Sequence, residues 1–470
     1  MSSEWKQVRL GDFIDSCLGK MLDQKKNKGN FHPYLGNINV RWGEFELSDL
    51  SKMKFEDAEH ERYSLKKGDL VVCEGGSEPG RCAIWEGEIS DIKIQKALHR
   101  IRTLSGLVSG YLYYWFLLEG KNGSLEPFCT GTAIKHLTGK SLGNLKIALP
   151  PVSYQEKCVS ILKSIDRKIK HNKKINQTLE QMAQALFKSW FVDFEPVKAK
   201  IAVLEAGGSQ EDATLAAMTA ISGKYADALV VFERKHPELY AELKVTAGLF
   251  PSAMQDSELG AIPVDWQVSP LSRKIKLTGG GTPKRSESSF WDGEICWYSV
   301  KDAPSESDVF VIDTIEKITK KGLDKSSAKL LPVGTTIISA RGTVGKLALT
   351  AVEMAMNQSC YGISGGEFSG PLLTYLKVKQ YVDVLKRNTH GAVFDTITTS
   401  TFETVVTLTA SKPVNDQFEK IVTPLFNSIE NNLRTNASLT QLRDTLLPKL
   451  LSGEITLPEA EQAVSEAENV

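Results

Sequence analysis

The chain contains the stretch ILKSIDRKIKHNKKINQTLEQMAQALFKSW at residues 161–190 and repeats its pattern as IVTPLFNSIENNLRTNASLTQLRDTLLPKL at residues 421–450. Apolar and asparagine side chains recur in both stretches at steps of three and four, which is the period of one face of an α-helix. Because the matched positions share one offset of 260 residues, we interpret the two stretches as a long helix that occurs twice. The matched positions are Ile161, Leu162, Ile165, Ile169, Asn172, Asn176, Leu179, Met182, Leu186 and Trp190, and then Ile421, Val422, Leu425, Ile429, Asn432, Asn436, Leu439, Leu442, Leu446 and Leu450.

Both helices have start and stop signals. An S-x-x-E capping box that begins at Ser153 precedes the first helix, and nothing breaks the pattern before Phe191. We expect Asn415 to cap the start of the second helix and Gly453 to end it. Pro424 lies inside the second helix and predicts a kink.

The shared stripe predicts that the two helices pack against each other in antiparallel order. Asn172 and Asn176 fall on the inward face, as do Asn432 and Asn436. Buried asparagine at such positions costs stability but fixes the register of a helix pair. The simpler alternative is two unrelated amphipathic helices, each packed on its own globe.

Each helix follows a mixed segment of strands, short helices and loops, which we call the first and the second globe. Fainter repeats connect the globes: Gly68–Cys73 resembles Gly334–Ser339, and Gly110–Leu118 resembles Pro371–Lys379. The predicted fold is α/β (α+β), with two globes alternating with two helices in a pseudo-twofold arrangement. The predicted parts are the first globe 1–150, the first helix 151–195, a helical spacer 196–260, the second globe 261–411, the second helix 412–455 and an acidic tail 456–470.

Composition excludes several classes of protein. Basic and acidic residues both number 57, so a large positive field does not attract nucleic acid to the chain. The globes and the first helix carry a small positive excess, and the spacer and tail are acidic. The seven cysteines form no CxxC pair and indicate reduced thiols, and the longest apolar run, Tyr111–Leu118, is too short to span a bilayer. The start of the sequence has no signal-peptide pattern, so we expect a cytoplasmic protein without a membrane partner.

Polar loops supply candidate DNA contacts, because Arg, Lys, Asn, Gln and Ser side chains read base edges and bind phosphates. The same residue types are the normal content of solvated loops, and that alternative stays open. The candidates in the first globe are Lys20, Asn37, Asn39, Arg41, Arg81 and Lys135, near a lysine run that also includes Lys25, Lys26 and Lys28. Those in the second globe are Thr282, Lys284, Arg285, Ser299, Lys301, Arg341, Thr343, Asn357 and Gln358. A common frame with divergent loops predicts two different half-sites.

The sequence contains no catalytic motif that we recognise. It lacks the NPPY-type tetrapeptide and the FxGxG motif of adenine methyltransferases, a P-loop, the Rossmann glycine spacing and an HExxH motif. We therefore expect no catalytic residue, no metal site and no cofactor in this chain. A less favoured hypothesis is an enzyme, such as a nuclease, with an unrecognised site.

Several motifs, in their order and spacing, make the chain resemble the specificity subunits of Type I restriction-modification enzymes over essentially its whole length. They are Leu149–Gln155, Ala185–Phe194, Gly281–Pro283, Ser339–Gly342 and Leu446–Ile455. The resemblance implies that each globe is a target recognition domain for one half of a bipartite, asymmetric DNA site.

The resemblance also implies partners. The helix pair would set the distance between half-sites and dock two modification subunits, which hold S-adenosylmethionine and methylate adenine N6. Restriction subunits would add translocation and cleavage driven by ATP and Mg²⁺, as an antiviral defence. The residues predicted to hold the helix pair and its partners are Ile165, Ile169, Leu179, Leu186, Trp190, Leu425, Ile429, Leu439, Leu446 and Leu450.

The family's contact loops carry over to the second globe better than to the first. Gly281–Arg285, Ser339–Thr343 and Asn357–Gln358 match the family pattern. The first globe has Gly19-Lys20-Met-Leu where the family has a Gly-Thr-Pro loop, and Glu74-Gly-Gly in place of Ala340-Arg-Gly. Two alternatives remain: a stand-alone DNA-binding regulator or adaptor, and the specificity part of a Type IIB-like enzyme.

Overall fold

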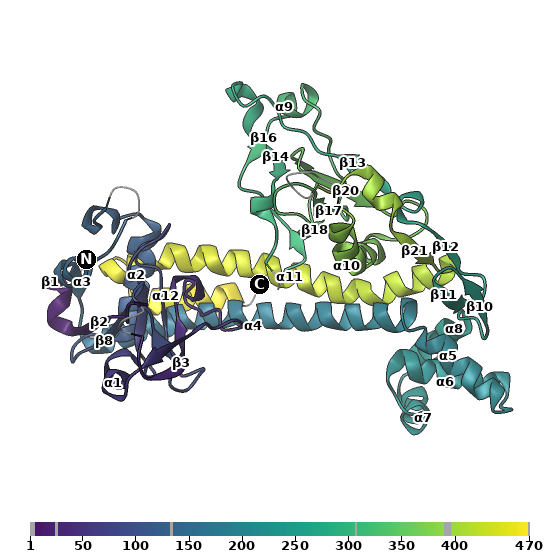
Figure 1. Cartoon of the computed structure of the whole chain (residues 1–470), viewed down its shortest axis with the longest axis horizontal. Helices are drawn as coiled ribbons and strands as arrows, with labels where there is room; N and C mark the ends of the chain where they lie inside the picture. The colour runs from purple at the N-terminus through teal and green to yellow at the C-terminus, as the bar shows by residue number, and fades with distance from the viewer. Residues whose placement is uncertain (1–4, 24–26, 132–134, 306–307, 390–395, 469–470) are drawn as a thin grey trace. The chain divides into compact units, whose positions relative to one another are not determined.

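Two long helices, α4 (Val152–Phe191) and α11 (Lys412–Ser452), organise the computed structural model (Figure 1). The structure describes residues 5–23, 27–131, 135–305, 308–389 and 396–468. The chain divides into two units, the first comprising residues 1–169 and 437–470, and the second residues 170–436. Each unit therefore holds one globe and a part of each long helix.

The first unit contains a four-stranded sheet in the order β2-β8-β5-β6, a three-stranded sheet β4-β3-β7 and the pair β1-β9. The four-stranded sheet and the β1-β9 pair pack against α2 (Ser109–Lys121), whose Tyr111–Leu117 segment is buried. The strands are β1 Lys6–Arg9, β2 Ile14–Leu18, β3 Asn30–Leu35, β4 Lys52–Phe55, β5 Leu70–Cys73, β6 Cys82–Ile84, β7 Lys93–Ile94, β8 Leu98–Thr103 and β9 Lys146–Leu149. The remaining helices are α1 His60–Tyr63, α3 Gly139–Asn144 and α12 Leu457–Glu468.

The second unit repeats this plan with additions. Its sheets are β13-β20-β17-β18-β15, β16-β14-β19 and the pairs β12-β21 and β10-β11. The strands are β10 Met254–Ser257, β11 Gly260–Pro263, β12 Gln267–Pro270, β13 Lys276–Gly279, β14 Trp291–Tyr298, β15 Phe310–Val311, β16 Lys317–Ile318, β17 Thr336–Ser339, β18 Leu347–Thr350, β19 Met354–Met356, β20 Cys360–Ser364 and β21 Val406–Thr409. The helices are α5 Glu195–Glu205, α6 Gln210–Ser222, α7 Ala226–Lys235, α8 Pro237–Gly248, α9 Lys320–Asp324 and α10 Pro371–Arg387.

The repeat extends to the hydrogen bonds that attach each globe to its helix. Gln155 on α4 is fully buried, and its side-chain amide donates to the carbonyls of Gly106 and Pro150, 2.9 and 2.8 Å away. Asn415, 260 residues later on α11, donates in the same way to the carbonyls of Phe368 and Ala410. Two separate copies of one attachment confirm the predicted repeat of a globe with its helix.

The ends of the two long helices differ in part from the sequence predictions. The capping-box prediction was wrong, because α4 begins at Val152 and Ser153 is already helical, while the Pro151 carbonyl accepts the first helical N–H groups. Asn415 is likewise inside α11 and serves as an attachment residue, not as a cap. The predicted stop at Gly453 is confirmed, since it adopts the left-handed φ of +72° that glycine allows without strain. Helix α11 continues through Pro424.

The two helices are antiparallel within each unit. In the first unit, the Tyr154 hydroxyl donates to the Leu450 carbonyl and Arg443 pairs with Asp166. In the second unit, Trp190 packs against Phe418 with ring centroids 5.5 Å apart. The contacts thus run from high to low residue number on one helix as the number rises on the other, as predicted.

The buried face of α4 differs in part from the predicted stripe. Met182 is 49% exposed, and the prediction that it lies on the inward face was wrong. Ala183 and Phe187 are buried instead. The reason is that α4 packs against α11 and also against elements of the second globe and the spacer. The buried face of α4 is therefore wider than the stripe that faces α11 and is displaced to one side of it.

Paired asparagines form a polar layer between the helices of the second unit. Asn172 donates to Asn436 over 2.9 Å, and Asn432 donates to Asn176 over 2.8 Å. The 260-residue repeat exchanges these two bonds, so each asparagine pair is the sequence counterpart of the other.

We predict that Asn172→Ala lowers the free energy of unfolding by about 1–3 kcal/mol, because it leaves the Oδ1 atom of the buried Asn436 without its hydrogen-bond donor. Urea unfolding followed by circular dichroism measures this loss. The control is Asn431→Ala at an exposed position on α11, the helix that carries Asn436, and no change is expected from it. Equal losses in the two variants would remove the polar layer as a determinant of register.

The segments that follow the two long helices are also related. The predicted acidic tail forms α12, whose Ala460 and Val464 are buried in the core of the first unit. Like α5, which follows α4, it has proline in its first turn. Helix α5 at the start of the spacer therefore has a counterpart after the second long helix. No single helix of the described residues is long and apolar enough to cross a membrane; α6 and α7 reach that length and hydropathy only as a pair bent by 84°.

Candidate nucleic-acid interface

Three loops of the second globe meet at one end of its five-stranded sheet. The Gly280 and Gly281 amides donate to the carbonyls of Cys360 and Met356, and the Ala340 amide donates to Ser359. A Cβ atom on Gly280 would lie 1.9 Å from the Asn357 carbonyl oxygen, so only glycine permits this approach. These contacts therefore bring together candidate residues from three separate segments, 281–285, 339–343 and 357–358.

A rigid turn presents Arg341. The buried Ser339 donates its hydroxyl to the Thr343 carbonyl over 2.5 Å and accepts the Lys346 amide over 2.8 Å, which closes the turn. Arg341 and Thr343 are exposed on it. The Arg341 guanidinium makes no hydrogen bond or ion pair with any residue that the structure describes, so its five donors are available to a ligand. Lys284 is also exposed, in the neighbouring loop.

Other candidates of the second globe have structural partners. Arg285 forms a two-pronged ion pair with Glu316 and stacks on Trp291, with the guanidinium carbon 3.9 Å from the ring centroid. The hydrogen bond from Arg285 holds the pKa of Glu316 below its usual value. Ser299 donates to Asp302 within a capped turn. These contacts hold the loops around Arg285 and Ser299 in place, and their side chains are already engaged within the chain.

The remaining second-globe candidates lie beside this turn. Thr282 donates to the exposed Gln358 side chain, and Asn357 accepts the Ser359 amide over 3.0 Å. Lys301 is exposed near Glu316, where its charge also lowers the pKa of that carboxyl. The loops therefore contain some polar side chains that are exposed and others that already form hydrogen bonds or ion pairs within the chain.

The prediction that Lys20 contacts DNA is wrong, because the residue is only 2% exposed. Its ammonium donates to the Lys54 carbonyl over 2.9 Å, pairs with Glu59 and lies 5.0 Å from the centre of the Phe55 ring. Burial of a lysine is tolerated here because the ammonium has these partners. The sequence could not reveal this pairing, since Glu59 lies 39 residues away.

The other candidates of the first globe mostly build one loop. Asn39 is 5% exposed, accepts the Gly36 amide and donates to the Glu46 carbonyl. The prediction that Asn39 contacts DNA directly is therefore wrong as well. Asn37 is half-buried and Arg41 is exposed in the same loop. The half-buried Arg81, in the loop between β5 and β6, pairs with Glu78 and donates to the Asn37 carbonyl over 3.1 Å. Lys135 pairs with Glu126, and Lys25 and Lys26 lie outside the described residues.

The first globe also contains a cluster of two histidines and an aspartate that the sequence spacing does not reveal. His32, His60 and Asp91 place potential metal-ligand atoms within 4.8 Å of one another. The fully buried Lys93 ammonium already donates to Asp91, to Ser64 over 2.7 Å and to His60 over 3.1 Å. Lys93 thus supplies the positive charge at the place where a metal ion would sit.

The residues predicted for the helix pair are used within the chain. Ile165, Leu439, Leu446 and Leu450 belong to the buried core of the first unit, and Ile169 packs against it. Trp190 and Ile429 belong to the core of the second unit, which Leu179, Leu186 and Leu425 flank. A partner protein would therefore contact the outer faces of these helices.

Comparisons with known proteins agree with this architecture. The family model described as Type I restriction modification DNA specificity domain matches residues 2–181 and 263–441, one match for each globe with its helix. The HindI specificity subunit of Haemophilus influenzae is 31% identical over 96% of this chain and 100% of its own length. The MjaIX specificity subunit of Methanocaldococcus jannaschii is 28% identical over 75% of this chain and 71% of its own length.

Solved structures of the same kind align along most of the chain at low identity. The S subunit of a Type I restriction-modification system from M. genitalium gives a TM-score of 0.47 at 14% identity, covering 96% of this chain and 97% of its own. The assignment itself rests on the sequence matches, which span both globes and both helices. The chain therefore belongs to the family of Type I restriction-modification DNA specificity subunits.

Proposed function

We propose that this chain selects the DNA target of a Type I restriction-modification complex, with each globe reading one half of a bipartite, asymmetric site. One observation carries the proposal. Two copies of the same sheets are attached to α4 and α11 by equivalent amides, Gln155 and Asn415, but their loops differ in charge. Equivalent frames with different loops suit two half-sites of different sequence.

The loops that correspond to each other illustrate the difference. In the second globe, the turn after β17 carries the exposed and unpaired Arg341. In the first globe, the segment after β5 carries Glu74 and Glu78 instead, and Arg81 is paired with Glu78. An arginine fork matches the two acceptors of guanine in the major groove, whereas carboxylates accept from cytosine and repel phosphate. The two globes therefore have different recognition chemistry.

The helix pair supplies the second part of the proposal. Its inner faces are filled by apolar side chains and by the asparagine layer, which fixes the register of α4 against α11. A fixed register sets a fixed distance between the bases that are read. The outer faces then dock two modification subunits, which hold S-adenosylmethionine for adenine N6 methylation. Restriction subunits that use ATP and Mg²⁺ complete the cytoplasmic complex.

The decisive experiment is a genome-wide map of N6-methyladenine in the host with and without this gene. We expect one gapped, two-part motif to lose methylation on deletion and to regain it on complementation. Purification of the tagged chain should recover a methyltransferase subunit with it. An unchanged map together with a chain that purifies without a methyltransferase would instead favour a stand-alone DNA-binding adaptor.

A further inference from the structure

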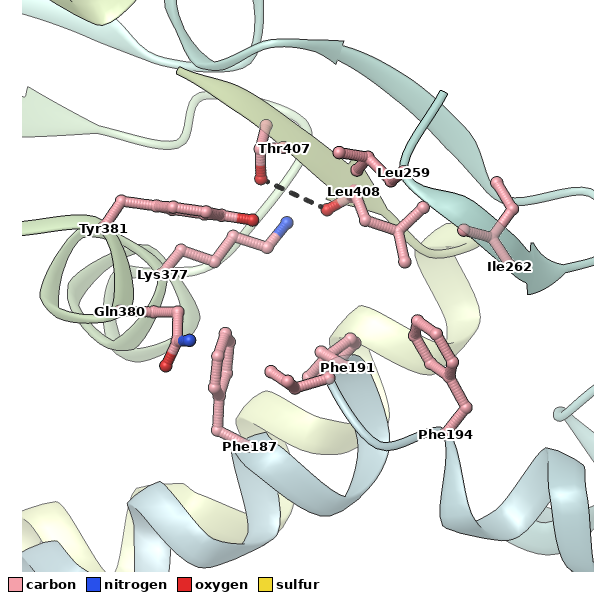
Figure 2. Close-up of a pocket in the computed structure, with 11 residues that line it drawn as sticks. Phe187, Phe191, Phe194, Leu259, Ile262, Lys377, Gln380, Tyr381, Thr407 and Leu408 are labelled. Atoms are coloured by element: carbon pink, nitrogen blue, oxygen red, sulfur yellow. Dashed lines mark hydrogen bonds between the residues drawn. The ribbon is translucent and has the colours of Figure 1, made fainter. Parts of the chain in front are cut away.

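A cavity of about 190 Å³ lies in the second unit, where the end of α4 meets α10, β21 and the turn between β10 and β11 (Figure 2). Phe187 and Phe191 form one wall, and Leu408 faces them; all three are buried. Val192 and Leu259 are 38% and 48% exposed and form the rim. The cavity is therefore open at one side, and its lining combines these apolar side chains with the polar Gln380, Tyr381 and Thr407.

Lys377 enters this cavity from α10. Figure 2 shows its side chain lying beside Tyr381, with the amine directed toward β21 and the interior. The residue is only 6% exposed, yet its ammonium makes no hydrogen bond or ion pair with any residue that the structure describes. Burial, reinforced by the charge of Lys274, lowers the pKa of Lys377 to about 8.

The other buried lysines of the described chain show how unusual this is. Lys93 donates to Ser64 over 2.7 Å, Lys200 donates to the Phe250 carbonyl over 2.6 Å, and Lys20 donates to the Lys54 carbonyl. The ammonium of Lys377 meets the open cavity instead of a protein acceptor, and exceptions of this kind to the usual pairing concentrate at functional sites. Lys377 lacks the partner that each of the others has.

The first globe shows that the fold itself does not need a lysine here. When Gly110–Leu118 of α2 is matched to Pro371–Lys379 of α10, Lys377 corresponds to Phe116, which is fully buried. The same helix in the same frame is therefore built with an aromatic side chain at this position. The lysine is a feature of the second globe, and its unpaired charge is directed into a cavity.

We propose that this cavity is a binding site for a small organic monocarboxylate with a compact aromatic or branched apolar body. The carboxylate would accept from the Lys377 ammonium, and the apolar body would contact Phe187, Phe191 and Leu408. A single lysine provides one positive charge, which balances one carboxylate but leaves half of a phosphate dianion's charge uncompensated. A cavity of about 150 Å³ holds a benzene molecule, so this one is large enough for a substituted ring.

The test is isothermal titration calorimetry of the purified full chain with phenylacetate and with its neutral analogue phenylacetamide. We expect phenylacetate to bind about tenfold to hundredfold more tightly, because only it forms a charge-assisted hydrogen bond with Lys377. Lys377→Met should abolish this preference. Lys386→Met, at an exposed position on the same helix, is the matched control and should retain it.

A second variant covers the case in which Lys377→Met disturbs folding. Leu259→Trp changes only an exposed rim residue and should block entry while Lys377 stays in place. Loss of phenylacetate binding in this variant, with an unchanged thermal unfolding midpoint, would support the site. Absence of binding to the wild-type chain, or equal binding by wild type, Lys377→Met and Leu259→Trp, would overturn the proposal.

Discussion

Replacing Arg341 with alanine is expected to lower methylation of the cognate DNA site by about 10- to 100-fold while the complex still assembles. The guanidinium stands exposed on a turn that Ser339 closes, and it has no partner among the described residues. A bidentate contact from arginine to guanine contributes about 1–3 kcal/mol of discrimination, which sets the size of the effect. Initial rates of methylation on cognate and mutated half-sites measure it.

The controls separate base reading from general charge. Lys346→Ala removes an exposed positive charge from the same turn and should lower the methylation rate on all sequences by a similar, smaller factor. Arg341→Lys keeps the charge but not the fork, so it should resemble Arg341→Ala in its choice of sequence. If Arg341→Ala methylates the same motif at the wild-type rate, Arg341 has no part in target reading.

Arg285 is the instructive contrast to Arg341. Both arginines lie in loops that sequence reasoning selected for DNA contact, and both are exposed. Only Arg285 pairs with Glu316, which is 31 residues away, and stacks on Trp291. Composition and spacing cannot distinguish the two, because the distinction depends on which acidic side chain the fold brings close. The same reason explains why Lys20 and Asn39 were selected although both are buried.

The parts of the fold that could be predicted are those with a local or repeated signal. The step of three and four residues gave α4 and α11, and the shared offset gave their antiparallel pairing through Asn172 and Asn436. The sequence does not predict which other faces of each helix are buried by the globes. Phe187 is buried because α11 and the second globe both pack against that side of α4. The periodicity of a single helix cannot show this, because it carries no information about the globe.

The second large effect is expected from Arg443→Met, which should lower the free energy of unfolding of the first unit by about 2–3 kcal/mol. Arg443 on α11 donates to Asp166 on α4 over 2.8 Å and to Asp444 over 2.9 and 3.0 Å. Asp166 also accepts from the Tyr114 hydroxyl of α2 over 2.7 Å. The Asp166 side chain is 28% exposed in the intact structure. Arg443→Met leaves its carboxylate without a compensating cation, because the methionine fills the space but does not replace the charge.

A double-mutant cycle distinguishes this ion pair from simple packing. Asp166→Asn removes the charge that Arg443 compensates, so the double variant should lose less stability than the sum of the two single variants. Lys412→Met is the control on the same helix: Lys412 and its partner Asp416 are both exposed, and a surface pair of this kind contributes about 0–1 kcal/mol. Strict additivity of the Arg443 and Asp166 variants would contradict the proposed coupling.

Acid unfolding gives an independent reading of the same network. Burial favours the neutral form of Asp444, but the hydrogen bonds from Lys121 and Arg443 outweigh it and hold the pKa of Asp444 below its ordinary value of 3.8. A carboxyl whose pKa is depressed by folding stabilises the protein above that ordinary value, and the stabilisation is lost as the pH falls through the lowered pKa. Arg443→Met removes one of the two donors, so its stability should fall less steeply below pH 4 than that of the wild type. The first unit would then owe part of its acid sensitivity to the contact that joins α11 to α4 and α2, and a profile parallel to the wild type would assign that sensitivity elsewhere.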